Sequence, residues 1–300
     1  MDLSPLAISS VQKTLAFQRE AMSIIAHQYE TDEFSKNQLV QSLNTLYNTS
    51  IYHRGKIVLC GIGKSYKIAA KLVATLNSLA IQSSILHPSE ALHGDLGMLR
   101  EGDALIFVTA SGNTPELLNL LPHISLNIPI VLLTCCRESK LSKSVQVKSI
   151  LYAELPSHLK EDSIHGLPAP TVSATVTLAL ADATILALSE LIEADLAKRK
   201  VSFSMNHPGG SIGASLSHLN VNMLRQQESE SPTEGTVSAQ SERKENYRSS
   251  SSSLLSLSQI ASSTSRGPNL YIPSSSNGIS ISSPSSSDYD DDTSTKSRIL

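Results

Sequence analysis

Two short segments rich in glycine, serine and threonine each follow an apolar run and could bind an anion. Gly61-Ile62-Gly63-Lys64-Ser65 follows residues 56–60, and the Thr-Ala-Ser-Gly-Asn-Thr-Pro-Glu segment at 109–116 follows residues 104–108. When a strand ends in such residues and a helix then begins, backbone N–H groups and hydroxyls converge at the helix N-terminus, where phosphate is the usual ligand. Two such turns in one domain predict a site for a phosphorylated small molecule.

The first turn fits neither of two familiar nucleotide-binding patterns. A P-loop needs a glycine five positions before Gly63, where Val58 stands. A dinucleotide-binding turn needs a third glycine at the position of Tyr66. What remains is a tight turn that brings the backbone close to a ligand and aims Lys64 and Ser65 at the same space. From this turn alone, a ligand site and a plain strand-to-helix turn with a solvated lysine are equally open.

The second turn indicates where the next helix begins. Thr114 is the expected N-cap, and Pro115 suits the first helical position. Ser111 and Asn113 then surround the positive end of that helix. Glu116 falls in the first turn, where acidic residues are common for dipole reasons alone. Taken by itself, Glu116 therefore fits ordinary helix chemistry better than catalysis.

Three further polar segments contain histidine. His87, Glu90 and His93 have a spacing that could hold a metal, but a loop packed over the site is the simpler interpretation. His207 begins a His-Pro-Gly-Gly turn, where an imidazole can serve as a general acid or base near neutral pH, or else cap a helix. Glu161 lies in a segment that, taken alone, is only a polar loop.

The elements expected around these residues alternate between strands and helices. Helical spacing predicts two helices first, over residues 5–30 and 34–48. Strands are expected at 56–60, 83–86, 104–109, 129–134 and 149–152, and further helices at 65–79, 115–126, 171–197 and 211–219. Apolar strands that alternate with helices are typical of a parallel sheet covered on both faces. The predicted fold class is α/β, a three-layer sandwich around a five-stranded parallel sheet.

The composition separates a folded part from a polar tail. Apolar residues make up 40% of the 300-residue chain, and their large runs lie before residue 220. Residues 225–300 are rich in serine and include an acidic run, so they cannot bury enough apolar surface to offset their ordering entropy. We expect one domain over residues 1–224 and a disordered Ser-rich acidic tail over residues 225–300. A phosphorylated tail and a merely solubilising one are equally open.

Charge and cysteine usage argue against several function classes. The net charge of -3 includes no basic stripe, which argues against nucleic acid as a partner. Cys60, Cys135 and Cys136 lie in or at the end of apolar runs, as reduced core cysteines do. The longest apolar stretch, residues 169–188, carries an aspartate and many hydroxyl residues, and residues 1–10 lack the features of a signal peptide. We expect a cytoplasmic protein that binds neither nucleic acid nor a membrane.

Together these segments resemble the sugar isomerase (SIS) domain and, within it, the arabinose-5-phosphate isomerase family. The resemblance covers about residues 10–220 and is carried by residues 61–65, His-Pro-Ser-Glu at 87–90, His-Gly-Asp-Leu-Gly-Met at 93–98, Ser-Gly-Asn-Thr-Pro-Glu at 111–116, Ala-Pro-Thr at 169–171 and His-Pro-Gly-Gly at 207–210. It implies a five-stranded parallel α/β sandwich that assembles as a homotetramer or homodimer. It also implies interconversion of D-ribulose 5-phosphate and D-arabinose 5-phosphate without a cofactor.

The resemblance further implies the site residues, with no metal among the ligands. The catalytic residues carried over by motif position are Lys64, Glu116, Glu161 and His207. The substrate- and phosphate-binding residues are Gly61, Gly63, Ser65, His93, Ser111, Gly112, Asn113, Thr114 and Thr171. Isomerisation through an enediol needs a carbon base and a proton shuttle. We expect one of the two glutamates as the base, His207 as the shuttle, and Lys64 as a fixed cation beside the enediolate.

The chain departs from the family in two places. The segment between Glu161 and Thr171 is one residue longer than the family pattern, and a Ser-rich tail stands where bacterial members usually carry a pair of CBS domains. Two alternatives to the family reaction follow: isomerisation of another sugar phosphate, and a non-catalytic sugar-phosphate sensor whose tail recruits a partner. Retention of all four implied catalytic residues favours an enzyme, because a sensor needs only the hydroxyls and N–H groups that hold the ligand.

Overall fold

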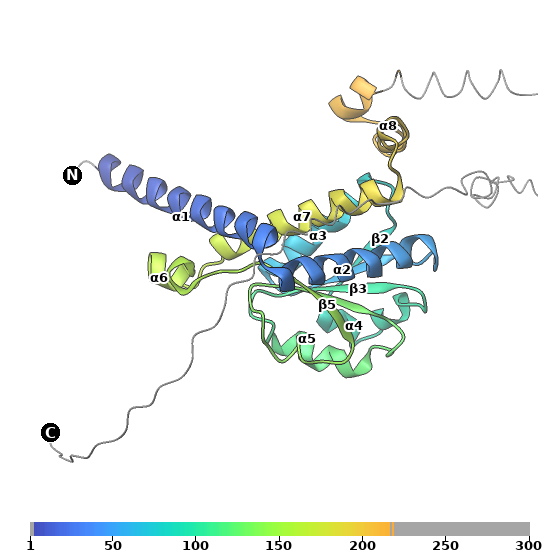
Figure 1. Cartoon of the computed structure of the whole chain (residues 1–300), viewed down its shortest axis with the longest axis horizontal. Coiled ribbons are helices and arrows are strands. Elements are labelled where there is room, and N and C mark those ends of the chain that lie inside the picture. Colours follow the sequence, from blue (N-terminus) through green and yellow to red (C-terminus); the bar gives the residue numbers. More distant parts are fainter. Residues whose placement is uncertain (1–2, 217, 219–300) are drawn as a thin grey trace, which may run out of the picture. The chain divides into compact units, whose positions relative to one another are not determined.

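The computed structural model describes residues 3–216 and 218, which contain one five-stranded sheet and the helices around it (Figure 1). The strands are β1 (Ile57–Cys60), β2 (Ser83–Leu86), β3 (Ala104–Val108), β4 (Ile130–Thr134) and β5 (Val147–Tyr152). The α-helices are α1 (Ser4–Thr31), α2 (Glu33–Ile51), α3 (Lys64–Ser78), α4 (Pro88–Ala91), α5 (Pro115–Leu120), α6 (Glu161–His165), α7 (Val172–Ile192) and α8 (Leu196–Met205). Short 3-10 helices are η1 (Asp95–Met98), η2 (Leu121–His123) and η3 (Ser157–Leu159). The predicted boundary at residue 224 and the predicted tail lie outside the described residues.

The sheet is parallel throughout, with the strand order β2-β1-β3-β4-β5. This confirms the predicted five-stranded parallel sheet. The chain leaves β1 toward β2 on one side and returns to β3 on the other, so the loops that follow β1 and β3 diverge. A parallel α/β sheet opens a ligand-binding crevice at this point, beyond the carboxyl ends of the two strands. The two turns of interest follow these two strands.

Helices cover both faces of the sheet and complete three layers (Figure 1). Leu59 and Ile106 belong to one apolar cluster, which includes residues of α1, α2, α3 and α7. Val58 and Phe107 point the other way, into a cluster that includes residues of α4 and α5. Because successive side chains on a strand alternate between the faces, the fully apolar central strands can feed both clusters.

Helix α1 runs parallel to α7 and extends beyond the start of α7. Gln18 donates a hydrogen bond to Thr175 Oγ1 (3.3 Å), which fixes the register near the middle of α1. The second half of α1 then packs along α7. The first half projects from the domain (Figure 1), and most of its side chains are exposed. Lys13 Nζ donates a hydrogen bond to the Ile164 carbonyl of α6 (2.9 Å).

A buried ion pair joins β1 to β3 at the other end of the sheet. Asp103, 3% exposed, accepts hydrogen bonds from the backbone N–H groups of Lys56 and Arg100 (2.9 Å each) and pairs with the Lys56 ammonium. Burial strengthens this interaction because water does not screen it. The pair fixes the start of both site-bearing strands relative to each other.

Two predicted helices are wrong at their C-terminal ends. The predicted helix at 115–126 ends at residue 120, and a 3-10 turn containing Pro122 follows, because proline lacks the N–H that would continue the α-helix. The predicted helix at 171–197 ends at Ile192. Glu193 is extended, and Asp195 begins α8 by accepting the N–H groups of the next turn.

Helix α7 is, within the described part of the chain, the one helix long and apolar enough to cross a membrane. About half of its most apolar window (56%) is buried in the fold, as in a core helix.

Cys60 is buried, Cys135 and Cys136 are half-buried, and all three are free thiols. Their reduced state stays a prediction.

Candidate functional site

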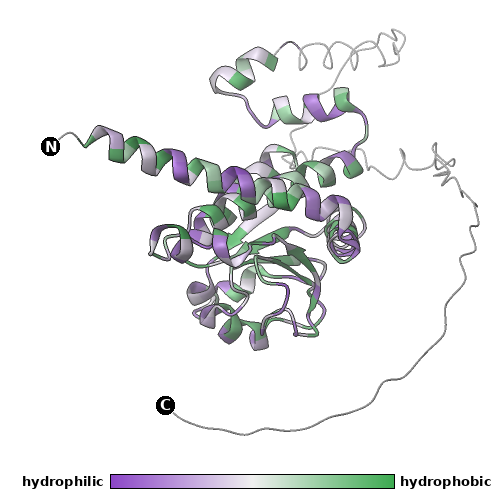
Figure 2. Ribbon diagram, turned by 60° about the vertical axis from the view of Figure 1, so that its left-hand side comes forward, coloured by the Kyte–Doolittle hydropathy of each residue, from purple (hydrophilic) through white to green (hydrophobic). Residues whose placement is uncertain are grey.

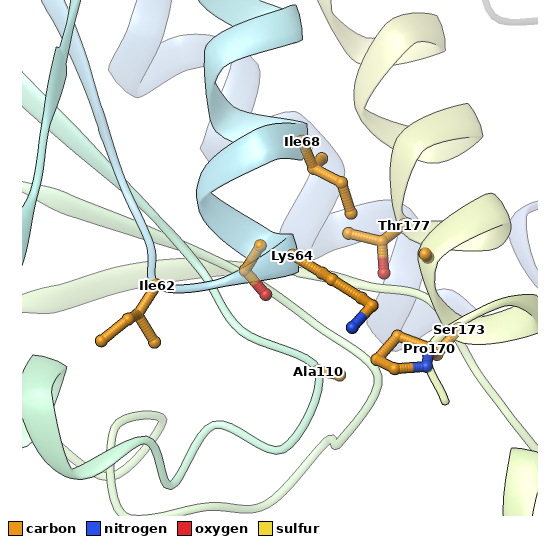
Figure 3. A pocket seen from close by; sticks show the side chains of 9 residues that line it. Ile62, Lys64, Ile68, Ala110, Pro170, Ser173 and Thr177 are labelled. Atoms are coloured by element: carbon orange, nitrogen blue, oxygen red, sulfur yellow. The ribbon is translucent and has the colours of Figure 1, made fainter. Parts of the chain in front are cut away.

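A pocket of about 210 Å³ opens where β1 and β3 end and where α3 and α7 begin (Figure 3). Its wall consists of Ile62, Lys64, Ser65, Ile68, Ala110, Pro170, Ser173, Ala174 and Thr177. Two helix N-termini therefore contribute to one small space. The start of α3 offers backbone N–H groups and the positive end of its helix dipole to an anion, whereas Glu161 accepts two of the first N–H groups of α7.

Glycine is required in the turn after β1 because the backbones approach closely. A Cβ atom on Gly61 would lie 3.1 Å from the Val108 carbonyl oxygen of β3 and 3.0 Å from the Ser65 carbonyl carbon. Gly63 is the N-cap of α3 and has φ of 59°, in the region that side-chain-bearing residues avoid. The two glycines thus place the start of α3 directly against the end of β3.

Lys64 extends from the start of α3 across the pocket toward Pro170 and Ser173 at the start of α7 (Figure 3). Its side chain is exposed, and no carboxylate of the described chain lies within 4.0 Å of its ammonium. An unpaired cation beside two helix N-termini is suited to a phosphate or to the negative charge of an enediolate. Ser65, the next residue, adds a hydroxyl to the same wall.

The turn after β3 is braced by its own hydrogen bonds and by its packing. Gly112 has φ of 63°, and a Cβ there would lie 2.2 Å from Ser139 Oγ. The Gly112 N–H donates to Thr109 Oγ1 (3.2 Å), whose hydroxyl also bonds Thr114 Oγ1 (2.7 Å). Thr114 is the N-cap of α5 as predicted, but its hydroxyl bonds Thr109 rather than a helix N–H. The turn is therefore held in one shape.

The other polar residues of this turn lie beside the pocket rather than in its wall. Asn113 N–H donates to Ser111 Oγ (3.1 Å), and Asn113 Oδ1 accepts from the Lys140 N–H (2.9 Å). Both Ser111 and Asn113 are exposed, and Ala110 is the residue of the turn that lines the pocket. Contacts from Ser111 through Thr114 to a ligand stay predictions.

Glu161 holds the N-terminus of α7. It is 8% exposed, and its Oε1 atom accepts from the Thr171 N–H (2.9 Å), the Ser173 N–H (2.9 Å) and the Ser173 hydroxyl (2.6 Å). Burial by itself would raise the pKa of this carboxyl, but the hydrogen bonds from Ser173 and Thr171 outweigh it and lower the pKa below its ordinary value. Glu161 is thus an ionised cap directly behind the pocket wall.

Thr171 is the N-cap of α7 and is not among the residues that line the pocket. Its Oγ1 atom is buried and makes no hydrogen bond within the described residues. A buried hydroxyl without a partner costs free energy, and this one is closed off from the pocket. The expected contact of Thr171 with substrate stays a prediction.

Two predicted residues on the other side of the sheet lie outside the pocket wall. Glu116 is half-buried in the first turn of α5, and its carboxylate makes no hydrogen bond or ion pair in the part of the chain described. His93 is exposed in the turn between α4 and η1.

The ring of His87 caps α4 by accepting the Ser89 N–H (3.3 Å). The described residues contain no group of three His, Cys, Asp or Glu side chains that could hold a metal ion.

His207 lies near the C-terminal end of α3, at the opposite end of that helix from the pocket. The neighbouring Asn206 donates to the carbonyls of Asn77 and Ser78 (3.2 and 3.4 Å) at the end of α3, whereas the pocket lies at the start of α3. Fifteen helical residues separate these ends by about 22 Å. The His207 ring stacks on Phe203 at 4.1 Å, and its Nδ1–H donates to the Phe203 carbonyl (2.7 Å). One chain therefore does not bring His207 to the pocket.

Sequence reasoning missed two polar pocket residues on α7. Ser173 and Thr177 are four residues apart and so lie on the same face of the helix, one turn after the other. The Thr177 hydroxyl also lies 3.5 Å from Cys135 Sγ at the end of β4. The available signal was the pair of hydroxyl residues at this spacing directly after the Ala-Pro-Thr segment.

The SIS-domain model matches residues 50–187 of the chain. The arabinose 5-phosphate isomerase KpsF of Escherichia coli is 34% identical over 218 residues, which are 71% of this chain and 60% of that protein. The arabinose 5-phosphate isomerase KdsD of Pseudomonas aeruginosa is 32% identical over 210 residues, 70% of this chain and 58% of that protein. The chain thus spans about 60% of the length of these relatives.

Solved structures show the same fold. The Escherichia coli CFT073 protein c3406, solved in complex with A5P, is 29% identical, has a TM-score of 0.57, and is matched over 69% of this chain and 100% of its own. A Bacteroides fragilis protein proposed to be a phosphosugar isomerase in capsule formation is 27% identical, has a TM-score of 0.58, and is matched over 68% and 98%. The pocket thus lies in a SIS fold, and the chain belongs to the SIS-domain family, with the arabinose 5-phosphate isomerases KpsF and KdsD among its relatives.

Proposed function

We propose that the chain is a sugar-phosphate isomerase that interconverts D-ribulose 5-phosphate and D-arabinose 5-phosphate through an enediol, without a cofactor. The observation that carries this proposal is the unpaired Lys64 ammonium between the N-termini of α3 and α7, at the sheet crevice. The names of the relatives KpsF and KdsD supply the reaction. The solved relative in complex with A5P supports a phosphosugar as the ligand.

The phosphate group is assigned to the turn after β1. The N–H groups at the start of α3 and the Ser65 hydroxyl would donate hydrogen bonds to its oxygens. Ser111 and Asn113, from the turn after β3, would reach it from the other side of the crevice. The carbonyl end of the sugar would then extend from the pocket past Lys64 and over the turn after β3, toward Glu116 in the first turn of α5.

The proton transfer is assigned to Glu116. In the forward direction a base removes a proton from C1 of the ketose, a cis-enediol forms, and the proton returns to C2, while a second proton moves between the two oxygens. Glu161 is a poor candidate for the base because three hydrogen bonds engage one oxygen and its pKa is lowered. Glu116 has an unengaged carboxylate. Lys64 would stabilise the enediolate as a fixed cation.

The proton shuttle is assigned to His207 of a second copy. In one chain, about 22 Å of α3 separates the pocket from the region of His207, which is too far for any proton transfer. A homo-oligomer, dimer or tetramer, removes the difficulty if the His-Pro-Gly-Gly turn of one copy faces the pocket of another. The site is then completed only on association.

The test is direct observation of the reaction by NMR, with D-ribulose 5-phosphate as substrate. Formation of D-arabinose 5-phosphate is expected with the wild type and with Lys67→Ala, a control that removes an exposed lysine from the same helix. Lys64→Ala and Glu116→Gln are expected to lower turnover at least about 100-fold while folding is kept. If the wild type binds D-ribulose 5-phosphate in calorimetry but yields no product, the sensor alternative replaces the enzyme.

A further inference from the structure

Thr177 brings a buried hydroxyl to the pocket from α7, across from the start of α3. Its side chain is 3% exposed and belongs to the pocket wall. Figure 3 shows its oxygen pointing into the space that the Lys64 side chain crosses. Most of the wall around this hydroxyl is apolar and consists of Ile62, Ile68, Ala110, Pro170 and Ala174. A polar atom that faces a pocket from a mostly apolar wall is typical of a group that recognises a ligand.

The Thr177 hydroxyl is not used by its own helix. On α7 the hydroxyls of Thr175 and Thr184 donate to the carbonyl groups four residues before them (2.9 and 2.8 Å). This is a common way for a helix to satisfy a threonine hydroxyl. Thr177 lies between these two residues, and within the described chain its hydroxyl has one partner at hydrogen-bond distance, Cys135 Sγ (3.5 Å). The helix itself therefore does not explain the direction of this side chain.

The thiol of Cys135 leaves the Thr177 proton available to a ligand. Burial raises the pKa of Cys135 to about 11, so the thiol keeps its proton at neutral pH. Cys135 packs against the apolar cluster that includes residues of α7, and the strands of the sheet are mostly hydrophobic (Figure 2). Because sulfur is a weak acceptor, an oxygen ligand competes well for the Thr177 O–H. The Cys135 S–H then donates to Thr177 Oγ1.

Ser173, the other hydroxyl residue that α7 contributes to the wall, has no proton left for a ligand. Its hydroxyl donates to Glu161 Oε1 (2.6 Å), and an ionised carboxylate only accepts hydrogen bonds. An anion in the pocket therefore meets one hydroxyl donor from the described part of α7, that of Thr177. From the opposite side it meets the Ser65 hydroxyl, the Lys64 ammonium and the N–H groups at the start of α3.

We propose that Thr177 is a further substrate-binding residue and donates its hydroxyl proton to a phosphate oxygen of the phosphosugar. This inference rests on the proposed function, which assigns the phosphate to the turn after β1 and therefore to this pocket. The oxygens of a phosphate dianion only accept hydrogen bonds, and they are held best by charge-assisted donors. Thr177, Lys64 and the start of α3 then offer protons to one anion from two sides.

A phosphate fits the position of Thr177 better than a sugar hydroxyl does. A neutral hydroxyl gains little from the Lys64 ammonium, whereas an anion gains a charge-assisted contact. A sugar hydroxyl also has to place its own proton, but the Cys135 thiol already donates toward the Thr177 oxygen. The pocket has a volume of about 210 Å³, and the sugar is expected to extend out of it over the turn after β3.

The test is the equilibrium binding of two probes by titration calorimetry. The probes are inorganic phosphate and D-arabinitol 5-phosphate, a sugar-alcohol phosphate that has no carbonyl group and cannot isomerise. Thr177→Val removes the hydroxyl and keeps the shape of the side chain. It is expected to weaken the binding of both probes by about 10- to 100-fold, the usual loss for a hydrogen bond to a charged group. Thr177→Ser keeps the hydroxyl and should bind both probes within about threefold of the wild type.

Three further variants separate a ligand contact from a role in packing. Thr184→Val removes a buried hydroxyl of the same helix outside the pocket wall, and it should leave the binding of both probes unchanged. Cys135→Ala should change binding less than about threefold, because the ligand and not the thiol takes the Thr177 proton. Thr177→Ala should show the same loss as Thr177→Val, which guards against a folding defect in either variant. Equal losses in Cys135→Ala and Thr177→Val would overturn the proposal.

The two probes also decide which part of the ligand Thr177 contacts. Unchanged binding of both probes by Thr177→Val would overturn the proposal. A loss confined to D-arabinitol 5-phosphate would overturn it in favour of a contact with a sugar hydroxyl. If Thr177→Val loses both probes and the wild type yields no product from D-ribulose 5-phosphate, the phosphate contact stands and the proposed reaction fails. The two failures are therefore distinguishable.

Discussion

Replacement of Glu161 tests whether this residue only caps the N-terminus of α7 or also takes part in catalysis. In Glu161→Ala the N-terminus of α7 loses its acceptor, which costs about 1 kcal/mol for a helix cap. The buried Ser173 hydroxyl also loses its acceptor, which costs about 2 kcal/mol more. The expected loss of unfolding free energy is about 3 kcal/mol. For a domain of this size, that lowers Tm by about 6–12 °C.

Glu161→Gln is the informative companion variant. The amide keeps an oxygen that can accept the same hydrogen bonds and loses only the charge beside the helix dipole, so it should cost about 1 kcal/mol. Because the folded-state pKa of Glu161 is lowered, the carboxylate stabilises the wild type above its ordinary pKa and loses that effect as the pH falls. The stability difference between wild type and Glu161→Gln should therefore shrink below about pH 4.3. Urea unfolding across this pH range measures both quantities.

Turnover of D-ribulose 5-phosphate by Glu161→Gln shows whether Glu161 has a catalytic role. If Glu161 only positions α7, Glu161→Gln should keep turnover of D-ribulose 5-phosphate within about tenfold of the wild type, because the geometry of the pocket wall survives. A Glu161→Gln protein as stable as expected but at least about 100-fold slower would refute the assignment of Glu161 as a cap alone. A Glu161→Ala protein with unchanged Tm would refute the structural argument itself.

Three further predictions concern other parts of the chain. Gly112→Ala should lower unfolding free energy by about 2 kcal/mol in urea titrations, because the added Cβ meets Ser139 and φ is positive. Asp103→Ala should cost about 3 kcal/mol in the same assay and leave Lys56 without its buried partner. Removal of residues 226–300 should leave Tm and turnover unchanged; a truncated chain that aggregates or is inactive would contradict this.

Much of the fold could be predicted because its signals are local. The apolar runs of β1 and β3 and the glycine turns after them predicted both the strands and the crevice between them. Asp195 was a readable N-cap for α8, but the apolar pattern of α7 obscured it. The end of α5 before Pro122 was also predictable, because any proline interrupts the hydrogen bonds of an α-helix. The residues that start or end a strand or helix lie within a few positions of its boundary.

The candidate site was harder to predict because side chains far apart in the chain decide it. Lys64 and Ser65 were expected in the pocket, and they line it. Ser173 and Thr177 were not expected, because nothing within their own segment shows that α7 begins beside α3. The position of His207 depends on how α8 folds back against the end of α3, and sequence motifs alone gave no measure of that distance.

The pairing of α1 with α7 also has a consequence for synthesis of the chain. The contact between Gln18 and Thr175 joins residues 157 positions apart. At 5–20 residues per second, α1 leaves the ribosome about 8–30 s before the helix that covers it. Throughout that time one side of α1 lacks its intramolecular partner, and the large apolar side chains of its first half, Ile8, Val11 and Leu15, are exposed as well. Nascent chains of this protein should therefore depend on chaperones that hold amphipathic helices, and a chaperone-depleted translation system should yield aggregates rather than folded chain.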